Sequence, residues 1–294
     1  MTTPRFQVAL VAAACLVTMG CRATTASAAS PDVVTTATST EPVLPHQTFT
    51  LESRVLGETR RINVYTPPEY AQATQERYPV LYMPDGGLAE DFPHVIRTVD
   101  EAIRVGELRP LIVIGIENTE RRRDMSGPTE VESDRKIAPR VGGSANFRAF
   151  IRDELMPVVR ERVRGSGETG IMGESLAGLF VVETFLLEPA LFDHYVAISP
   201  SLWWNHQALL RSAPERLRAL PARPTSLFLT VAGDDEIDNA VATLAEHLRA
   251  AQSPSLTWCF EPMPGEHHST IYRAAAPAAL RKSFPPGSAD RSRK

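Results

Sequence analysis

The fold is decided by one stretch of the chain, Gly170-Ile171-Met172-Gly173-Glu174-Ser175-Leu176-Ala177-Gly178-Leu179. A short apolar strand leads into Gly173, and an apolar helical pattern leaves after Ser175. The stretch is close to the pattern G-x-S-x-G, with Ala177 at the last position. A serine on such a sharp strand-to-helix turn is exposed, and its neighbours are small because the backbone is crowded. The stretch therefore predicts Ser175 as a nucleophile, which needs a base and oxyanion donors beside it.

Two later loops supply the groups that this nucleophile requires. A buried strand, Leu227–Ala232, runs into the acidic loop Gly233-Asp234-Asp235-Glu236-Ile237-Asp238, and the last strand is followed by Gly265-Glu266-His267-His268-Ser269-Thr270. The order along the chain is serine, acid, histidine. This is the order of α/β-hydrolases and differs from that of chymotrypsin or subtilisin. The three segments together predict catalysis by a serine activated through a histidine.

The acidic loop offers three candidates for the carboxylate that holds the imidazole tautomer and stabilises imidazolium. The spacing G-x-x-acid from Gly233 favours Glu236, while Asp235 and Asp238 are close enough to compete. A serine–histidine dyad without an acid is the other alternative. The loop lacks the alternating ligands and central glycine of a calcium-binding EF-hand, and the adjacent histidines are weak evidence for zinc. We therefore expect neither a metal nor an organic cofactor.

Strand-like runs alternate with helical patterns through the body of the chain, which predicts an α/β fold with a mostly parallel central sheet flanked by helices. The first two strands are expected to be antiparallel, and the functional loops to lie at the carboxyl ends of the later strands. The long polar segment Glu117–Gly143 is typical of a lid or a binding loop, or of a disordered insertion. The expected strands are Thr48–Val55, Arg61–Thr66, Pro79–Met83, Leu111–Gly115, Gly170–Met172, Tyr195–Ile198, Leu227–Ala232 and Leu256–Glu261; the expected helices are Asn146–Arg162, Leu176–Leu187, Ile237–Ala251 and Thr270–Lys282.

The ends of the chain differ in composition from its body. Residues 1–28 have an apolar stretch, Phe6–Gly20, that is short for a membrane span, followed by the cleavage-like Ala26-Ser27-Ala28. This is typical of a signal peptide, with a buried N-terminal helix as the alternative. Residues 29–46 read as a flexible linker, 47–284 as the catalytic domain and 285–294 as a polar tail. We expect an exported protein, either periplasmic or secreted.

The cysteines and the net charge limit which partners the mature protein is expected to have. Cleavage before Cys21 would leave a cysteine for a lipid anchor, although the box Thr18–Cys21 is a loose match and soluble release is favoured. Cys259 is then the one cysteine of the body, so a disulfide framework is excluded. The net charge is −4, without a basic block or a basic-aromatic stripe, so nucleic acid is not an expected partner. The oligomeric state is left open.

The motifs resemble those of an esterase family of α/β-hydrolases that includes enterochelin (siderophore) esterases, S-formylglutathione hydrolase and the mycolyltransferases. The resemblance covers about residues 47 to 282, with Ala177 and Pro84 as departures. It is most similar to the siderophore-esterase branch. The residues that carry it are Tyr78 to Gly86, Arg121 to Met125, Phe150 to Pro157, Gly173 to Leu179, Ser199 to Trp204 and Gly265 to Thr270.

The resemblance implies roles for single residues. It favours His268 over His267 as the general base, because the family's histidine falls two residues before a Ser or Thr, here Thr270. The oxyanion hole is expected to combine the amide of Leu176 with that of Gly87, which follows the Asp-Gly pair, with an ordinary turn as the alternative interpretation of Asp85-Gly86-Gly87.

Three further residues are expected at the substrate. Trp203 and Trp204 are candidates for a substrate wall, with core packing as the alternative. Arg123 is a candidate for contact with an acidic or catecholate group, with an Arg–Asp brace to Asp124 as the alternative.

The implied activity is hydrolysis of carboxylic esters through an acyl-enzyme, with siderophore trilactones or their linear fragments as the first substrate class. A carbohydrate-linked acyl ester is the nearest alternative, and acyl transfer to an alcohol is another. A siderophore-binding protein on a hydrolase scaffold is the non-enzymatic alternative. The pair Ser175 and His268 argues against it, because a binding protein has no physical need for both residues.

Overall fold

The computed structural model describes residues 43–233 and 238–287. These residues belong to one compact unit, residues 42–294. The expected signal peptide, most of the linker and Cys21 lie outside the described residues, as does the end of the tail. No helix in the described ranges is long and apolar enough to cross a membrane.

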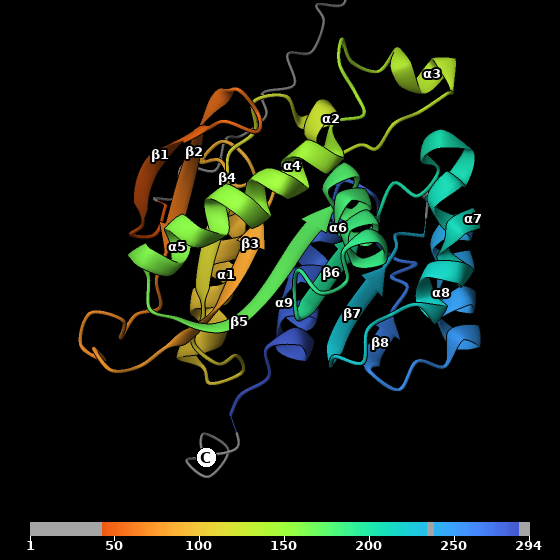
Figure 1. Cartoon of the computed structure of the whole chain (residues 1–294). Helices are drawn as coiled ribbons and strands as arrows, with labels where there is room; N and C mark the ends of the chain where they lie inside the picture. Colours follow the sequence, from red (N-terminus) through yellow and green to blue (C-terminus); the bar gives the residue numbers. More distant parts are fainter. Residues whose placement is uncertain (1–42, 234–237, 288–294) are drawn as a thin grey trace, which may run out of the picture. The chain divides into compact units, whose positions relative to one another are not determined.

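An eight-stranded sheet forms the centre of this unit (Figure 1). Its order is β1-β2-β4-β3-β5-β6-β7-β8; β1 pairs antiparallel with β2, β2 antiparallel with β4, and every later pair is parallel. The predicted α/β-hydrolase architecture and the antiparallel start are therefore confirmed. The strands are β1 (Gln47–Ser53), β2 (Glu58–Tyr65), β3 (Tyr78–Met83), β4 (Ile112–Ile116), β5 (Gly165–Glu174), β6 (His194–Ile198), β7 (Thr225–Thr230) and β8 (Leu256–Phe260).

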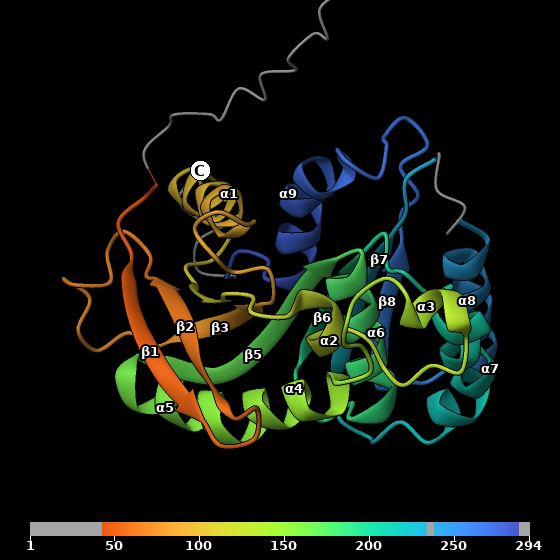
Figure 2. The ribbon, with the colours of Figure 1, turned by 90° about the horizontal axis from the view of Figure 1, so that it is seen from above.

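Helices cover both faces of the sheet (Figure 2). The helices α1 and α9 lie on one face, and α4 to α8 on the other. Neighbouring residues of β3 point to opposite faces, so Tyr82 packs with the larger group of helices and Leu81 with α1 and α9. The helices are α1 (Phe92–Arg104), α2 (Arg121–Asp124), α3 (Glu132–Arg135), α4 (Ser144–Phe150), the π-helical turn η1 (Ile151–Leu155), α5 (Met156–Arg162), α6 (Leu176–Leu187), α7 (Trp204–Arg218), α8 (Asp238–Ala251) and α9 (Ile271–Ser283).

Two long helices, α1 and α7, were not predicted from the sequence. The signal for α1 is present, since Phe92, Val95, Ile96 and Val99 follow the spacing of one buried helical face. The α7 segment is harder to predict, because it contains Pro214 and begins with three residues, 205–207, in the left-handed region. The predicted helix Asn146–Arg162 corresponds to α4, η1 and α5, where a π-helical turn interrupts the regular α-helix.

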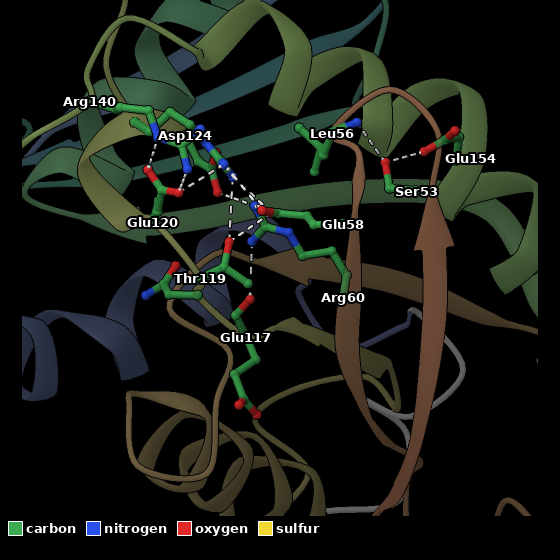
Figure 3. A network of polar contacts seen from close by, with 12 residues as sticks. Ser53, Leu56, Glu58, Arg60, Glu117, Thr119, Glu120, Asp124, Arg140 and Glu154 are labelled. Atoms are coloured by element: carbon green, nitrogen blue, oxygen red, sulfur yellow. Dashed lines mark hydrogen bonds and ion pairs between the residues drawn. The ribbon is translucent and has the colours of Figure 1, made fainter.

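The segment Glu117–Gly143 contains the short helices α2 and α3 and is tied to its surroundings by side chains. The guanidinium of Arg60, on β2, is fully buried and contacts both Asp124 of α2 and Glu58 (Figure 3). Further along, the indole of Trp204 donates a hydrogen bond to the carbonyl of Gly127 at 2.8 Å. This segment is therefore an ordered part of the domain.

Candidate active site

Ser175 lies on the turn between β5 and α6, at the carboxyl end of its strand. Its backbone has φ 59° and ψ −118°, a conformation that is strained for a residue with a side chain. A Cβ added at Gly173 would lie 2.7 Å from the Cβ of Ala177, so glycine is required where the helix turns back over the strand. The Ser175 amide donates to the carbonyl of Ile198 at 3.0 Å. The turn thus presents the serine hydroxyl beyond the edge of the sheet.

His268 reaches this hydroxyl from the loop between β8 and α9. Its Nε2 lies 3.0 Å from Ser175 Oγ, although the two residues are 93 positions apart. The neighbouring residue His267 contributes its carbonyl to the start of α9, accepting from the amides of Thr270 at 2.9 Å and Ile271 at 3.0 Å. Of the adjacent histidines, His268 is thus placed to accept the serine proton.

The predicted acids cannot be compared with this geometry. Asp235 and Glu236 lie outside the described residues, and Asp238 is described only as the first residue of α8. Assignment of the orienting carboxylate to Glu236 stays a prediction. No cluster of three or more His, Cys, Asp or Glu residues suited to a metal ion is present in residues 43–233 and 238–287.

A carboxyl group that was not predicted lies at the histidine. Glu174 Oε1 is 3.1 Å from His268 Nε2, the same nitrogen that contacts Ser175. An orienting carboxylate binds the opposite nitrogen, Nδ1, so this contact gives Glu174 a different role from the predicted acid. Burial raises the pKa of Glu174 to about 7, and the charges of His268 and Arg121 oppose that rise. Its position next to Ser175, the candidate nucleophile, was the signal available in the sequence.

The two predicted oxyanion donors differ in their surroundings. Leu176 is the first residue of α6, and amides of a first helical turn have no partner within the helix. The amide of Gly87 donates instead to Glu90 Oε2 at 2.7 Å. Glu90 Oε1 also accepts from the amide of Asn118 at 3.2 Å. For Gly87 to bind a substrate oxyanion, its amide must exchange the carboxyl group of Glu90 for the substrate.

The turn that carries Gly87 is pinned to the end of β4. Asp85 has φ 56°, and its carboxylate accepts from both sides of the Arg121 guanidinium at 2.7 and 2.8 Å. Asn118 donates to the same carboxylate at 2.5 Å. A Cβ at Gly86 would lie 2.1 Å from the backbone nitrogen of Ile116, so only glycine fits there. The backbone around the expected oxyanion site is therefore tightly constrained.

The two tryptophans have different environments. Trp204 is 5% exposed and its indole donates a hydrogen bond to the carbonyl of Gly127, so it packs in the core. Trp203 is 38% exposed. It follows Ser201 by two residues, and Ser201 Oγ lies 3.4 Å from Ser175 Oγ. Core packing therefore accounts for Trp204, while the exposed ring of Trp203 keeps the candidate role of a substrate wall.

The Arg123 guanidinium is occupied by protein carboxylates. It contacts Glu58 at 2.8 Å, Asp124 at 2.6 Å and Glu120 at 3.3 Å, and the Glu120 carboxylate also contacts Arg140 (Figure 3). This network joins α2 to β2. The geometry agrees with the Arg–Asp brace that was the alternative to a substrate contact.

Comparison with known proteins identifies relatives across most of the chain. The family model described as "Putative esterase" matches residues 53–280. Ferri-bacillibactin esterase BesA of Bacillus subtilis is 27% identical over 258 residues, covering 78% of this chain and 87% of that protein. Apo-salmochelin esterase of Escherichia coli is 26% identical over 247 residues, covering 76% and 74%.

Solved structures agree with these relatives. An IroE-like serine hydrolase from Shewanella oneidensis superposes with a TM-score of 0.75 and 27% identity, covering 82% of this chain and 80% of that one. The siderophore hydrolase EstB from Aspergillus nidulans has a TM-score of 0.69 and 23% identity, covering 83% and 95%, and shows the shared fold. With a family model that spans most of the domain, and with the order of serine and histidine typical of this fold, the chain belongs to the esterase family of α/β-hydrolases.

Proposed function

We propose that this protein is a serine esterase that cleaves carboxylic esters through an acyl-enzyme. The observation that carries the proposal is the 3.0 Å contact between Ser175 Oγ and His268 Nε2, made by a serine in a strained strand-to-helix turn. Membership of an esterase family supports an ester as the bond that is cleaved. Ser175 is the nucleophile and His268 the general base.

The reaction follows from this geometry. His268 Nε2 takes the hydroxyl proton as Ser175 Oγ attacks the ester carbonyl. The amide of Leu176, with that of Gly87 once Glu90 has moved away, stabilises the oxyanion. Collapse of the tetrahedral intermediate breaks the ester bond, and the leaving alcohol takes the proton from His268. Water then repeats these steps on the acyl-enzyme, releasing the acid and restoring Ser175.

Siderophore lactones and their linear fragments are the proposed substrates. Two relatives that align with most of this chain are named as esterases of bacillibactin and salmochelin. The exposed indole of Trp203, two residues beyond the Ser201 that contacts the nucleophile, would offer an aromatic siderophore a flat surface. A neutral or anionic aromatic ring of the substrate can stack on the indole of Trp203 without an ionic contact.

The proposal includes export of the protein, argued from residues 1–28 alone. N-terminal sequencing of material from the native host would begin at Ala29 for soluble release. A blocked terminus at Cys21, with incorporation of labelled fatty acid, would instead indicate a lipid anchor.

The activity test uses the mature protein beside Ser175→Ala and His268→Ala. We expect turnover of short p-nitrophenyl esters by the wild type, and loss of most of it in both variants with unchanged circular dichroism. Chromatography of a catecholate triserine trilactone, with and without iron, then tests the substrate class. A wild type that is inert to all these esters and to a fluorophosphonate probe would contradict the proposal. Siderophore binding measured by tryptophan fluorescence would then favour a binding protein.

A further inference from the structure

The serine hydroxyl and a carboxyl group lie at one nitrogen of the candidate base. His268 Nε2 is 3.0 Å from Ser175 Oγ and 3.1 Å from Glu174 Oε1. A neutral imidazole accepts the serine proton at Nε2. Once protonated, the same nitrogen becomes a donor and needs an acceptor. Glu174 is placed to be that acceptor.

The position of Glu174 is set by the sheet. It is the last residue of β5 and pairs with Ile198 of β6, which leaves its side chain 14% exposed. Within the described part of the chain, its carboxyl group has a single ionic or hydrogen-bonding contact, with His268. Burying a carboxyl group without compensating partners costs free energy. Among the described residues, no other ionic or hydrogen-bonding contact explains why Glu174 stands at this position.

The charged groups that face Glu174 come from three other elements. Arg121 of α2 attracts the Glu174 carboxylate, but its guanidinium is already paired with Asp85 through two hydrogen bonds. Asp85 itself repels Glu174. Asp91, before α1, is also repulsive and lies 3.3 Å from the ring of His94. On α9, burial and the charges of the same carboxylates raise the pKa of the Tyr272 hydroxyl.

Among these groups, His268 is the one in direct contact with Glu174, and its imidazole becomes a cation when it takes the serine proton. A positive charge that forms on the histidine during the reaction is therefore stabilised here at short range, in a partly water-excluded site.

We propose that Glu174 is a positioning residue that accepts the Nε2–H of the His268 imidazolium between the two proton transfers of each half-reaction. The inference rests on the proposed esterase function. The proton leaves Ser175 Oγ for His268 Nε2 as the bond from Oγ to the carbonyl carbon forms. It then passes to the leaving alcohol, and Glu174 accepts a hydrogen bond without taking the proton. The imidazole is thereby held at the reaction centre.

This role predicts a distinctive pH profile. Activity requires a neutral His268 and an ionised Glu174, and burial raises the pKa of Glu174 to about 7. Two groups must then have lost a proton in the active form, so the acid limb of log kcat/KM should reach a limiting slope of two. A carboxyl group with a merely structural role would leave a slope of one.

The test compares Glu174→Gln, which keeps the shape and removes the charge, with Glu183→Gln as a matched control. Glu183 is a partly buried glutamate of α6 whose ionic partner is Arg148. We expect Glu174→Gln to lower the plateau of kcat/KM for p-nitrophenyl butyrate about tenfold and to reduce the slope to one. Glu174→Asp keeps the charge and should keep the slope of two with a lower plateau. Glu183→Gln should match the wild type in slope.

A second readout does not depend on activity. The His268 ring signal in a histidine-labelled protein is assigned by its disappearance in His268→Ala and titrated by NMR. We expect its pKa to fall by about one unit in Glu174→Gln, because the imidazolium loses its carboxylate. An unchanged pKa together with an unchanged slope would overturn the role of Glu174. A wild type that hydrolyses no ester, while the His268 pKa still falls, would instead overturn the esterase function and leave the Glu174–His268 contact established.

Discussion

The turns that follow β3 and β5 lie at the ends of two paired strands, and they present opposite kinds of groups to the same site. Each has a residue with a left-handed backbone, Asp85 or Ser175, and each brings a partly buried carboxyl group with a raised pKa. After β5, the side chain of Ser175 already contacts the candidate base, His268. After β3, the amide of Gly87 is bonded to Glu90.

The two turns differ in how a side chain and a backbone amide are paired before a substrate binds. The hydroxyl of Ser175 and the imidazole of His268 already satisfy each other, so the candidate nucleophile is paired with its candidate base in this structure. A partly buried backbone N–H needs an acceptor at all times. In the turn after β3, the carboxyl group of Glu90 fills this need for the amide of Gly87.

The largest effect is expected from Ser175→Ala. Removal of the nucleophile should lower kcat for p-nitrophenyl esters at least ~10⁴-fold, since the remaining oxyanion donors supply only part of the rate enhancement. Circular dichroism should be unchanged. More than about 1% residual activity would mean that the turn after β5 does not carry the chemistry.

Gly87→Ala tests the turn after β3. An added Cβ would lie 2.8 Å from Glu90 Oε2 and 2.9 Å from Glu117 Cγ, so these side chains or the turn itself must shift. We expect kcat to fall about 10- to 100-fold, with a smaller change in KM, since one oxyanion donor is misplaced. Gly287→Ala is the control, because a Cβ there meets nothing within 4 Å. Equal kcat values in the two variants would contradict the expected displacement of the Gly87 amide.

Glu174→Gln should raise the free energy of unfolding at alkaline pH while it lowers activity. The pKa of Glu174 is raised from 4.5 to about 7 on folding, so the native state loses stability as the pH rises through that window. The neutral variant avoids this loss. It should therefore exceed the wild type in free energy of unfolding by on the order of 3 kcal/mol at pH 8. Urea denaturation at pH 4 and pH 8 checks this, and a gain that persists at pH 4 would contradict it.

The smallest effect is expected at Glu90. Glu90→Ala frees the Gly87 amide for the oxyanion, so kcat/KM should rise about two- to threefold. Glu90→Gln keeps an oxygen acceptor near Gly87 and should change kcat/KM less. Steady-state kinetics of both variants check this expectation. A fall in Glu90→Ala to the level of Gly87→Ala would show that the carboxyl group holds the turn in shape.

Local patterns were sufficient to predict the sheet and the strand-to-helix turn that carries Ser175. All eight strands were expected within a few residues, except that β5 begins earlier, at Gly165. Helix α6 was predicted with its observed bounds, Leu176–Leu187. Helix α7 was missed because its left-handed first turn and Pro214 contradict the usual signals of a helix. Such a turn is held by contacts from elsewhere, such as Asp134 accepting from the Asn205 amide at 2.8 Å.

By itself, the sequence determined the α/β-hydrolase fold and the family and supplied Ser175 as the candidate nucleophile, because hydrophobic periodicity and turn chemistry act between near neighbours. Only the tertiary structure decided that Glu174 meets Nε2 of His268, that Glu90 occupies the amide of Gly87, and that Arg123 pairs with Glu58. A side chain's partner across a packed site depends on how distant elements meet. Burial and charge at that meeting point are properties of the folded chain alone.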